Sequence, residues 1–218
     1  MLLDCGIPVK RIKEGLWSLG RRLSDVSACL VTHCHGDHVK SAQKLADQGI
    51  NIITSGGTIE AAHLTGRSVM PIKSLVDGGS AISIGSFVIY ALEVEHDAPE
   101  TLAFIVFSTE RDPVEKLLYV TDTEYFRYKV DHLTHILIEA NYDNDILSEN
   151  ASTGRIEVSR AKRTVNSHMS IETALLTLAR QDRSMLQQVW LLHLSSDNAG
   201  DDFKRRVQEL TGVEVYIA

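Results

Sequence analysis

The chain has 218 residues, of which 44% are hydrophobic, so it can bury a core of its own, and we expect one compact domain over residues 1–218. Its net charge of −7 argues against a broadly basic nucleic-acid-binding surface, although it leaves room for a polyanionic substrate beside bound cations. No apolar run reaches the ~20 residues of a membrane span, and the start lacks the length of a signal peptide, so we expect a cytoplasmic protein with no membrane partner.

Short apolar runs alternate with segments of helical period in the first part of the chain, which is typical of an α/β domain. Strands are predicted at Leu2–Cys5, Ala28–Thr32 and Asn51–Thr54. Helices are predicted from Pro8 to Gly20, His38 to Gln48 and Thr58 to Leu64.

The middle of the chain changes character, because apolar runs follow one another with only turn residues between them. These runs are Ala81–Ile84, Phe87–Glu95, Leu102–Ser108 and Lys116–Thr121, and we expect antiparallel hairpins. Further strands are predicted at His135–Ala140, Val189–Leu194 and Val213–Ile217, with helices at Ile171–Ala179 and Asp202–Leu210. This order predicts two mixed β-sheets packed face to face, with helices outside.

A dense group of metal-binding side chains follows the second predicted strand. The segment Thr32–His38 holds three histidines and an aspartate, namely His33, His35, Asp37 and His38. Neutral imidazole and carboxylate are ligands that Zn²⁺ takes, and Gly36 lets the backbone curl between them. The alternative is a solvent-facing, histidine-rich turn.

Three more candidate ligands lie near predicted strand ends, namely His96, Asp122 and His193. Each alone would be unremarkable, since a single histidine beside a strand is more often a hydrogen-bonded core residue. Together with the dense group they make seven candidate ligands, too many for one tetrahedral Zn²⁺. We therefore expect two divalent metal ions, Zn²⁺ or Mn²⁺.

These residues resemble the motifs of the metallo-β-lactamase superfamily, whose hallmark is HxHxDH followed by a separate His, an Asp and a final His. Leu2-Leu3-Asp4-Cys5-Gly6 is similar to the family's first motif. In detail the chain is most similar to the small exonuclease-like branch of Gram-positive bacteria and their phages. That likeness is carried by Glu95-His96-Asp97-Ala98-Pro99-Glu100, Tyr119-Val120-Thr121-Asp122-Thr123, Ile138-Glu139-Ala140-Asn141-Tyr142 and Leu192-His193-Leu194-Ser195.

The resemblance implies an αββα sandwich of two mixed β-sheets with flanking helices. It implies that His33, His35 and His96 hold one metal, that Asp37, His38 and His193 hold the other, and that Asp122 bridges both. Asp37 would also orient a metal-activated hydroxide, and Asp4 would receive the outer N–H of a ligand histidine.

The sequence departs from this branch at its start, because relatives usually have a first strand and a Gly/Ser-rich loop ahead of the segment that begins here at Met1. Without that strand, the edge at Leu2–Cys5 would stay unpaired. Either the start at Met1 is late, or another copy of the chain covers this edge in a homo-oligomer.

A further histidine, His168, precedes the helix predicted at Ile171 and lies outside the ligand set. Its place resembles that of a non-ligand histidine that reaches the scissile phosphate in phosphodiesterases of the superfamily; the alternative is a surface histidine. Upstream lie the basic residues Arg160, Lys162 and Arg163, which either bind an anionic substrate or form a solvated face.

The expected function is therefore metal-dependent hydrolysis of a phosphodiester, with DNA as the substrate of an exonuclease-like enzyme. Two alternatives remain open, because a fold does not fix a function. One is a metallohydrolase acting on a lactam or thioester. The other is a metal-binding interaction module without catalysis.

Overall fold

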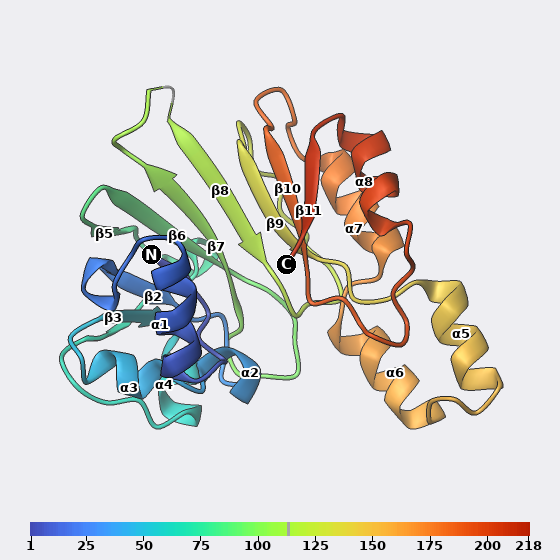
Figure 1. The fold of residues 1–218 in the computed structure, drawn as a ribbon, viewed down its shortest axis with the longest axis horizontal. Coiled ribbons are helices and arrows are strands. Elements are labelled where there is room, and N and C mark those ends of the chain that lie inside the picture. The colour runs from blue at the N-terminus through green and yellow to red at the C-terminus, as the bar shows by residue number, and fades with distance from the viewer. Residues whose placement is uncertain (113) are drawn as a thin grey trace. The chain divides into compact units, whose positions relative to one another are not determined.

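The computed structural model describes residues 1–112 and 114–218 (Figure 1). These residues form two compact units. The first comprises Met1–Glu93 and Ala98–Val106, and the second comprises Val94–Asp97 and the described part of Phe107–Ala218. Their strands belong to a four-stranded and a seven-stranded sheet, and helices flank both, so the predicted fold class is confirmed.

The four-stranded sheet lies in the first unit and contains strands in chain order: β1 (Leu2–Leu3), β2 (Ala28–Leu30), β3 (Asn51–Thr54) and β4 (Val69–Pro71). All three neighbouring pairs are parallel, so this sheet is not mixed as expected. The cause is that helices connect its strands, which parallel pairing requires. These helices are α1 (Val9–Ser18), α2 (Gly36–Val39), α3 (Ala42–Ala46) and α4 (Gly56–Ala61).

The first unit also contributes strands to the larger sheet. They are β5 (Ile82–Ile84), β6 (Phe87–Glu93) and most of β7 (Leu102–Ser108). The β5–β6 pair is antiparallel, which confirms the first predicted hairpin. Two single turns of 3-10 helix, Leu23–Asp25 and Leu75–Asp77, complete the unit.

The second unit contains four parallel strands, arranged in the order β11-β10-β9-β8. They are β8 (Glu115–Val120), β9 (His135–Glu139), β10 (Gln188–Leu192) and β11 (Glu214–Ile217). The helices are α5 (Asn144–Ser152), α6 (Val158–Ser167), α7 (Ile171–Arg180) and α8 (Phe203–Thr211). Helices α7 and α8 pack on each other and α8 packs on β11, whereas α5 and α6 form a separate pair (Figure 1).

Burial of apolar side chains fixes the strands that lead to the candidate ligands. Ala28, Cys29 and Leu30 of β2 are fully buried, and so are Ile136 and Ile138 of β9. Full burial of a Leu or Ile side chain stabilises the fold by roughly 1.5–3 kcal/mol. The buried strands therefore fix the positions at which the loops with the candidate ligands begin.

The helix predicted from His38 to Gln48 is wrong in its bounds, because two helices, α2 and α3, occupy this region. The break falls at Ser41, whose N–H donates to the carbonyl of Cys5 and whose hydroxyl donates to the carbonyl of Ile7. Contacts with the segment after β1 thus replace those of a continuous helix.

The prediction that His193 lies inside a strand is also wrong. Strand β10 ends at Leu192, and His193 has a left-handed backbone with φ of 55°. A strand cannot continue through that conformation. His193 therefore begins a loop at the strand's carboxyl end.

Two expectations from the sequence are not decided by these elements. Strand β1 is the last strand of its sheet among the described residues, and pairing of this edge with a second copy stays a prediction. Among the described residues, no helix combines the length and apolar character that crossing a bilayer requires.

We predict that Gly6→Ala destabilises the protein by about 1–3 kcal/mol, because the added Cβ would lie 1.5 Å from the carbonyl oxygen of Asp37 and must displace the loop that carries it. Gly15→Ala in α1 is the matched control, since nothing lies within 4 Å of its added Cβ and alanine favours a helix. Urea unfolding measures both. Equal stability of the Gly6 variant and the wild type would contradict the close approach.

Candidate metal centre

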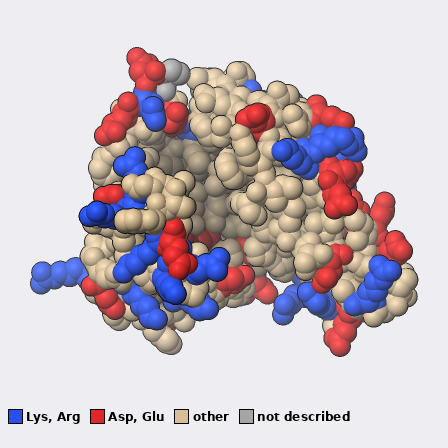
Figure 2. Space-filling view, in the orientation of Figure 1, with Lys and Arg blue, Asp and Glu red and all other residues tan. Residues whose placement is uncertain are grey.

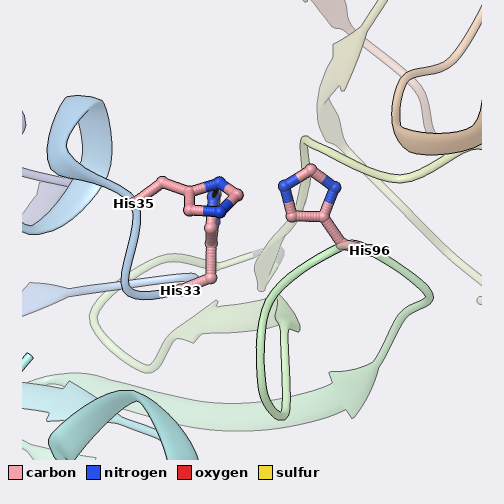
Figure 3. A group of neighbouring side chains, drawn as sticks. All are labelled: His33, His35 and His96. Carbon is pink, nitrogen blue, oxygen red and sulfur yellow. Dashed lines mark hydrogen bonds between the residues drawn. The ribbon is translucent and has the colours of Figure 1, made fainter. Parts of the chain in front are cut away.

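The first group of candidate ligands lies in the first unit, where the chain leaves β2. His33 is fully buried and His38 is nearly so. His33 Nε2 lies 3.0 Å from His35 Nδ1, and the two rings meet edge to face (Figure 3). The ring centroids of His33 and His38 are 4.2 Å apart. Asp37 is more exposed, with its Oδ2 3.7 Å from His38 Nε2. The unit thus gathers three imidazoles and a carboxylate.

The carboxylate of Asp4 contacts this first group of candidate ligands on the side of the Nδ1 atoms of His33 and His38. Its Oδ1 accepts the N–H of Thr32 at 2.8 Å, and its Oδ2 lies 2.7 Å from His38 Nδ1. A carboxylate can only accept there, so His38 Nδ1 carries the proton and Nε2 is the atom that could bind a metal. The Thr32 hydroxyl lies 3.0 Å from both Asp4 Oδ2 and His33 Nδ1, which links His33 to the same carboxylate. Asp4 has a left-handed φ of 55°, a strained conformation typical of functional sites.

The second group lies in the second unit, at the carboxyl ends of parallel strands. Asp122 follows β8, Glu139 ends β9 and His193 follows β10, while His168 precedes α7. Parallel strands place these ends at one edge of the sheet, where ligands commonly bind. Ligand atoms of all four residues lie within 4.8 Å of one another. Asp122 Oδ1 is 3.7 Å from His193 Nε2, and Asp122 shares the left-handed backbone of His193, with φ of 52°.

Glu139 is central to this group, although the sequence indicates it only as part of a motif and predicts no role for it. Its side chain is fully buried, and its Oε1 lies 2.7 Å from His168 Nδ1 and 3.2 Å from His193 Nδ1. The N–H groups of Thr123 and Met169 donate to its other oxygen at 3.2 Å. A buried carboxylate requires such partners, because an unpaired buried charge is costly. An acidic residue at the end of an apolar strand is the signal that could have identified it.

Two neighbours of Glu139 complete its surroundings. Asn141 Nδ2 lies 3.0 Å from His193 Nδ1 and donates to the His193 carbonyl at 2.8 Å, which fixes the strained loop. Burial, together with the negative charge of Glu139, raises the pKa of Tyr142 to about 12. The Tyr142 phenol therefore stays protonated and adds no charge to this region at neutral pH.

His96, which comes from the loop after β6, belongs to the second unit and is also drawn in Figure 3. Its side chain is almost fully buried. His96 Nδ1 donates to the carbonyl of Ser167 at 3.0 Å, and Nε2 lies 3.0 Å from Asp97 Oδ1. Since the carbonyl can only accept, Nδ1 carries a proton, and Nε2 would be the nitrogen that binds a metal in place of its contact with Asp97. Its ring meets that of His168 edge to face, with centroids 5.8 Å apart.

A pocket in the second unit brings His168 together with part of the basic run. Its cavity volume is about 280 Å³, and its lining includes His168, His193, Arg160 and Arg163. Ser195, Ser196 and Asn198 add polar groups to the wall. Lys162 instead lines a different hollow, between α5 and α6. The helix therefore separates Lys162 from the two arginines, which share one face of α6.

The chain matches the family model described as the beta-lactamase superfamily domain over residues 1–193. The chain belongs to this superfamily, and its structural neighbours have the metallo-β-lactamase fold.

Two similar proteins are named exodeoxyribonucleases. The chain is 27% identical to the exodeoxyribonuclease YycJ of Bacillus anthracis, over 91% of its own length and 75% of that protein. It is 26% identical to the exodeoxyribonuclease WalJ of Streptococcus pneumoniae, over 91% of this chain and 74% of that protein.

Two solved structures have similar folds. The metallo-beta-lactamase fold protein YhfI from Bacillus subtilis superposes with a TM-score of 0.69 at 18% identity, covering 99% of this chain and 83% of that one. The metallo hydrolase Igni18 from Ignicoccus hospitalis superposes with a TM-score of 0.61 at 15% identity, covering 88% of this chain and 76% of that one.

The fold implies divalent metal ions, and the donors present fit them. In the first unit, the contacts of Asp4 and Thr32 with Nδ1 leave His38 and His33 to offer Nε2. Ligand histidines usually have such a partner on the outer nitrogen, because it fixes the ring and raises its basicity. Two nitrogens 3.0 Å apart, as in His33 and His35, are near the ~3.3 Å spacing of ligands around a tetrahedral Zn²⁺ with bonds of ~2.0 Å. Imidazole and carboxylate are also the donor types that such ions prefer.

We predict that Asp4→Asn weakens divalent metal binding about 10- to 100-fold, because the amide cannot accept from both Thr32 and His38 as the carboxylate does. Asp47→Asn, an exposed change on the C-terminal side of α3, is the control. Metal titration with a chelating indicator measures the affinity, and circular dichroism checks the fold. An affinity loss no greater than that of the control would show that Asp4 does not support the ligands.

Proposed function

We propose that the chain is a metal-dependent phosphodiesterase that acts on DNA as an exonuclease-like enzyme, with residues 1–218 working as one hydrolase domain. The observation that carries this proposal is the pocket that His168 shares with Arg160 and Arg163. Hydrolysis of a phosphodiester is helped by a proton donor for the leaving oxygen and by cationic side chains that bind the phosphate. The exodeoxyribonuclease names of the relatives support the same substrate class.

We propose further that the chain holds two divalent cations, Zn²⁺ or Mn²⁺. As the family motifs imply, His33, His35 and His96 would bind one ion, Asp37, His38 and His193 would bind the other, and Asp122 would bridge them. When bound, such ions act as Lewis acids and lower the pKa of water toward ~7, which is the chemistry that hydrolysis at neutral pH needs. Asp37, whose carboxylate is largely exposed, would orient the attacking water.

His168 would act on the departing oxygen. Glu139 Oε1 lies 2.7 Å from its Nδ1, so the ring presents Nε2 on the opposite side. To act as a general acid, His168 would carry a second proton on Nε2 and donate it from there to the leaving alkoxide. Glu139 is therefore a positioning residue, and His168 is the catalytic one.

The arginines of α6 would bind the phosphate. Arg160 and Arg163 line the pocket with His168, and a guanidinium matches the geometry of phosphate oxygens. Arg160 also lies 3.9 Å from Asp197, a contact between half-exposed groups that a phosphate can displace. Lys162 would contribute only through longer-range attraction, because it lines the hollow between α5 and α6.

We predict two transition-metal ions per chain, and we expect Asp122→Ala to lower the occupancy of both, because one carboxylate would bridge them. Asp131→Ala, an exposed aspartate next to Lys129, is the control. Elemental analysis after purification in Zn²⁺ or Mn²⁺ gives the stoichiometry. One ion per wild-type chain, or the loss of a single ion from the variant, would refute the bridging assignment.

We predict that His168→Ala lowers phosphodiester hydrolysis about 10²- to 10⁴-fold while the metal content stays at the wild-type value, since His168 lies outside the ligand set. His132→Asn is the control, because His132 is exposed and contacts Asp182 instead. Initial rates on a DNA oligonucleotide, with parallel metal analysis, test this. Full activity of the His168 variant would overturn the nuclease proposal.

A further inference from the structure

Helix α1 exposes an unusual combination of side chains for an acidic protein. Residues 8–22 carry five basic residues, Lys10, Arg11, Lys13, Arg21 and Arg22, against the single acidic Glu14. Lys and Arg side chains gather over α1 on the face that Figure 2 shows. Trp17 is 72% exposed in the same helix. A tryptophan side chain that is exposed to this extent often marks a binding surface.

The basic and aromatic groups share one side of the helix. Lys10, Lys13 and Trp17 are three, four or seven residues apart, and together with Val9 and Glu14 they line one shallow hollow of about 770 Å³. The opposite side of α1 is used by the core, since Ile12 is buried and Leu16 packs on the same cluster. Glu14 lies 3.9 Å from Lys10 and 3.7 Å from Arg11, so its charge is already balanced.

The hollow begins close to the candidate metal ligands of its own unit. Gly6, just before α1, packs against the backbone of Asp37, and the N–H of Cys5 donates to the carbonyl of His38. From Val9 at the start of α1 to Trp17, the helix rises about 12 Å. A stacked nucleic-acid strand covers that distance in about three to four nucleotides at ~3.4 Å each.

We propose that the face formed by Lys10, Lys13 and Trp17, here called the α1 face, binds the single strand of the DNA substrate a few nucleotides away from the scissile bond. The ammonium groups contact phosphates, and the Trp17 indole stacks on a base. This inference rests on the proposed function for its substrate class. It adds a binding site that the metal ligands and the His168 pocket do not provide.

Charge and aromatic character together favour a nucleic-acid strand over the other occupants. Base stacking on an aromatic ring combined with a basic groove is how proteins bind single strands without reading their sequence. A membrane surface would need an apolar face that enters the lipid, but the apolar side of α1 is packed in the core. A second copy of the chain would bring the same cations against each other, which costs energy.

The test uses the full chain and does not depend on turnover. Trp190→Phe leaves Trp17 as the only tryptophan, and Trp190 is replaced conservatively beside Tyr216. We titrate this protein with a 20-nucleotide single strand in EDTA and expect quenching of Trp17 fluorescence. Trp17→Ala should weaken binding about 5- to 150-fold, whereas Trp17→Phe should keep most of the affinity. Lys10→Gln with Lys13→Gln should lower the slope of log K against log salt by about 1.4.

Matched controls are available on other surfaces. Leu176→Ala removes an apolar side chain that is 65% exposed on α7, and Lys44→Gln removes an exposed lysine of α3. Neither should change oligonucleotide binding. Hydrolysis of a dinucleotide, which is too short to reach Trp17, should be the same in Trp17→Ala and in the wild type.

Several results would contradict the proposed binding of a DNA strand to the α1 face. Dinucleotide cleavage with no response of Trp17 to the 20-nucleotide strand would refute it and leave the proposed function intact. A response of Trp17 to anionic phosphatidylglycerol vesicles but not to the oligonucleotide would assign the face to a membrane surface. A response only to rising protein concentration would assign it to a second copy. Strand binding without cleavage of any phosphodiester would instead refute the proposed function.

Discussion

Two carboxylates with little exposure to solvent, one in each unit, contact the imidazole rings of the two groups of candidate ligands. Asp4 contacts the outer nitrogen of His38 and the N–H of Thr32, and Glu139 contacts the outer nitrogens of His168 and His193. A contact on Nδ1 fixes both the tautomer and the direction of a ring, so it decides which nitrogen faces a metal or a substrate. These carboxylates are tolerable inside the protein because each accepts from N–H groups of the backbone as well.

The fold supports these contacts because several strands end at or just before the candidate ligands. Strand β2 leads into the histidine-rich loop, and β8, β9 and β10 lead to Asp122, Glu139 and His193. Asp4, Asp122 and His193 all adopt a left-handed backbone directly after or near a strand end. Such strain persists only where the surroundings determine it, and here buried residues of the adjoining strands, such as Val120 and Leu191, supply that rigidity. Stability of the sheets is therefore a condition for the geometry of the candidate ligands.

Patterning predicted the fold well where apolar residues form a short continuous run or repeat with the helical period. Strands at Asn51–Thr54 and Leu102–Ser108 have the predicted bounds, and α1 lies within the helix predicted from Pro8 to Gly20. Helices α5 and α6 were missed because they carry few apolar residues, although the side chain of Asp143 caps α5 in the usual way. The break between α2 and α3 depends on contacts with Cys5 and Ile7, which are distant in sequence and leave no local signal. For the same reason motif spacing could not assign a role to Glu139, whose partners come from three separate segments.

The family, the donor set and the pocket together support one proposal, namely that this chain cleaves phosphodiesters in DNA by metal-dependent hydrolysis. Membership of the superfamily alone does not select that bond, because the same metal ligands serve other substrates on this fold. The pocket of His168, Arg160 and Arg163 is what favours a phosphate. The most direct measurement is to incubate the wild-type protein, loaded with Zn²⁺ or Mn²⁺, with end-labelled DNA and in parallel with a β-lactam and a thioester. The account predicts stepwise release of nucleotides that stops when a chelator is added, and hydrolysis of the lactam or thioester without any phosphodiester cleavage would contradict it.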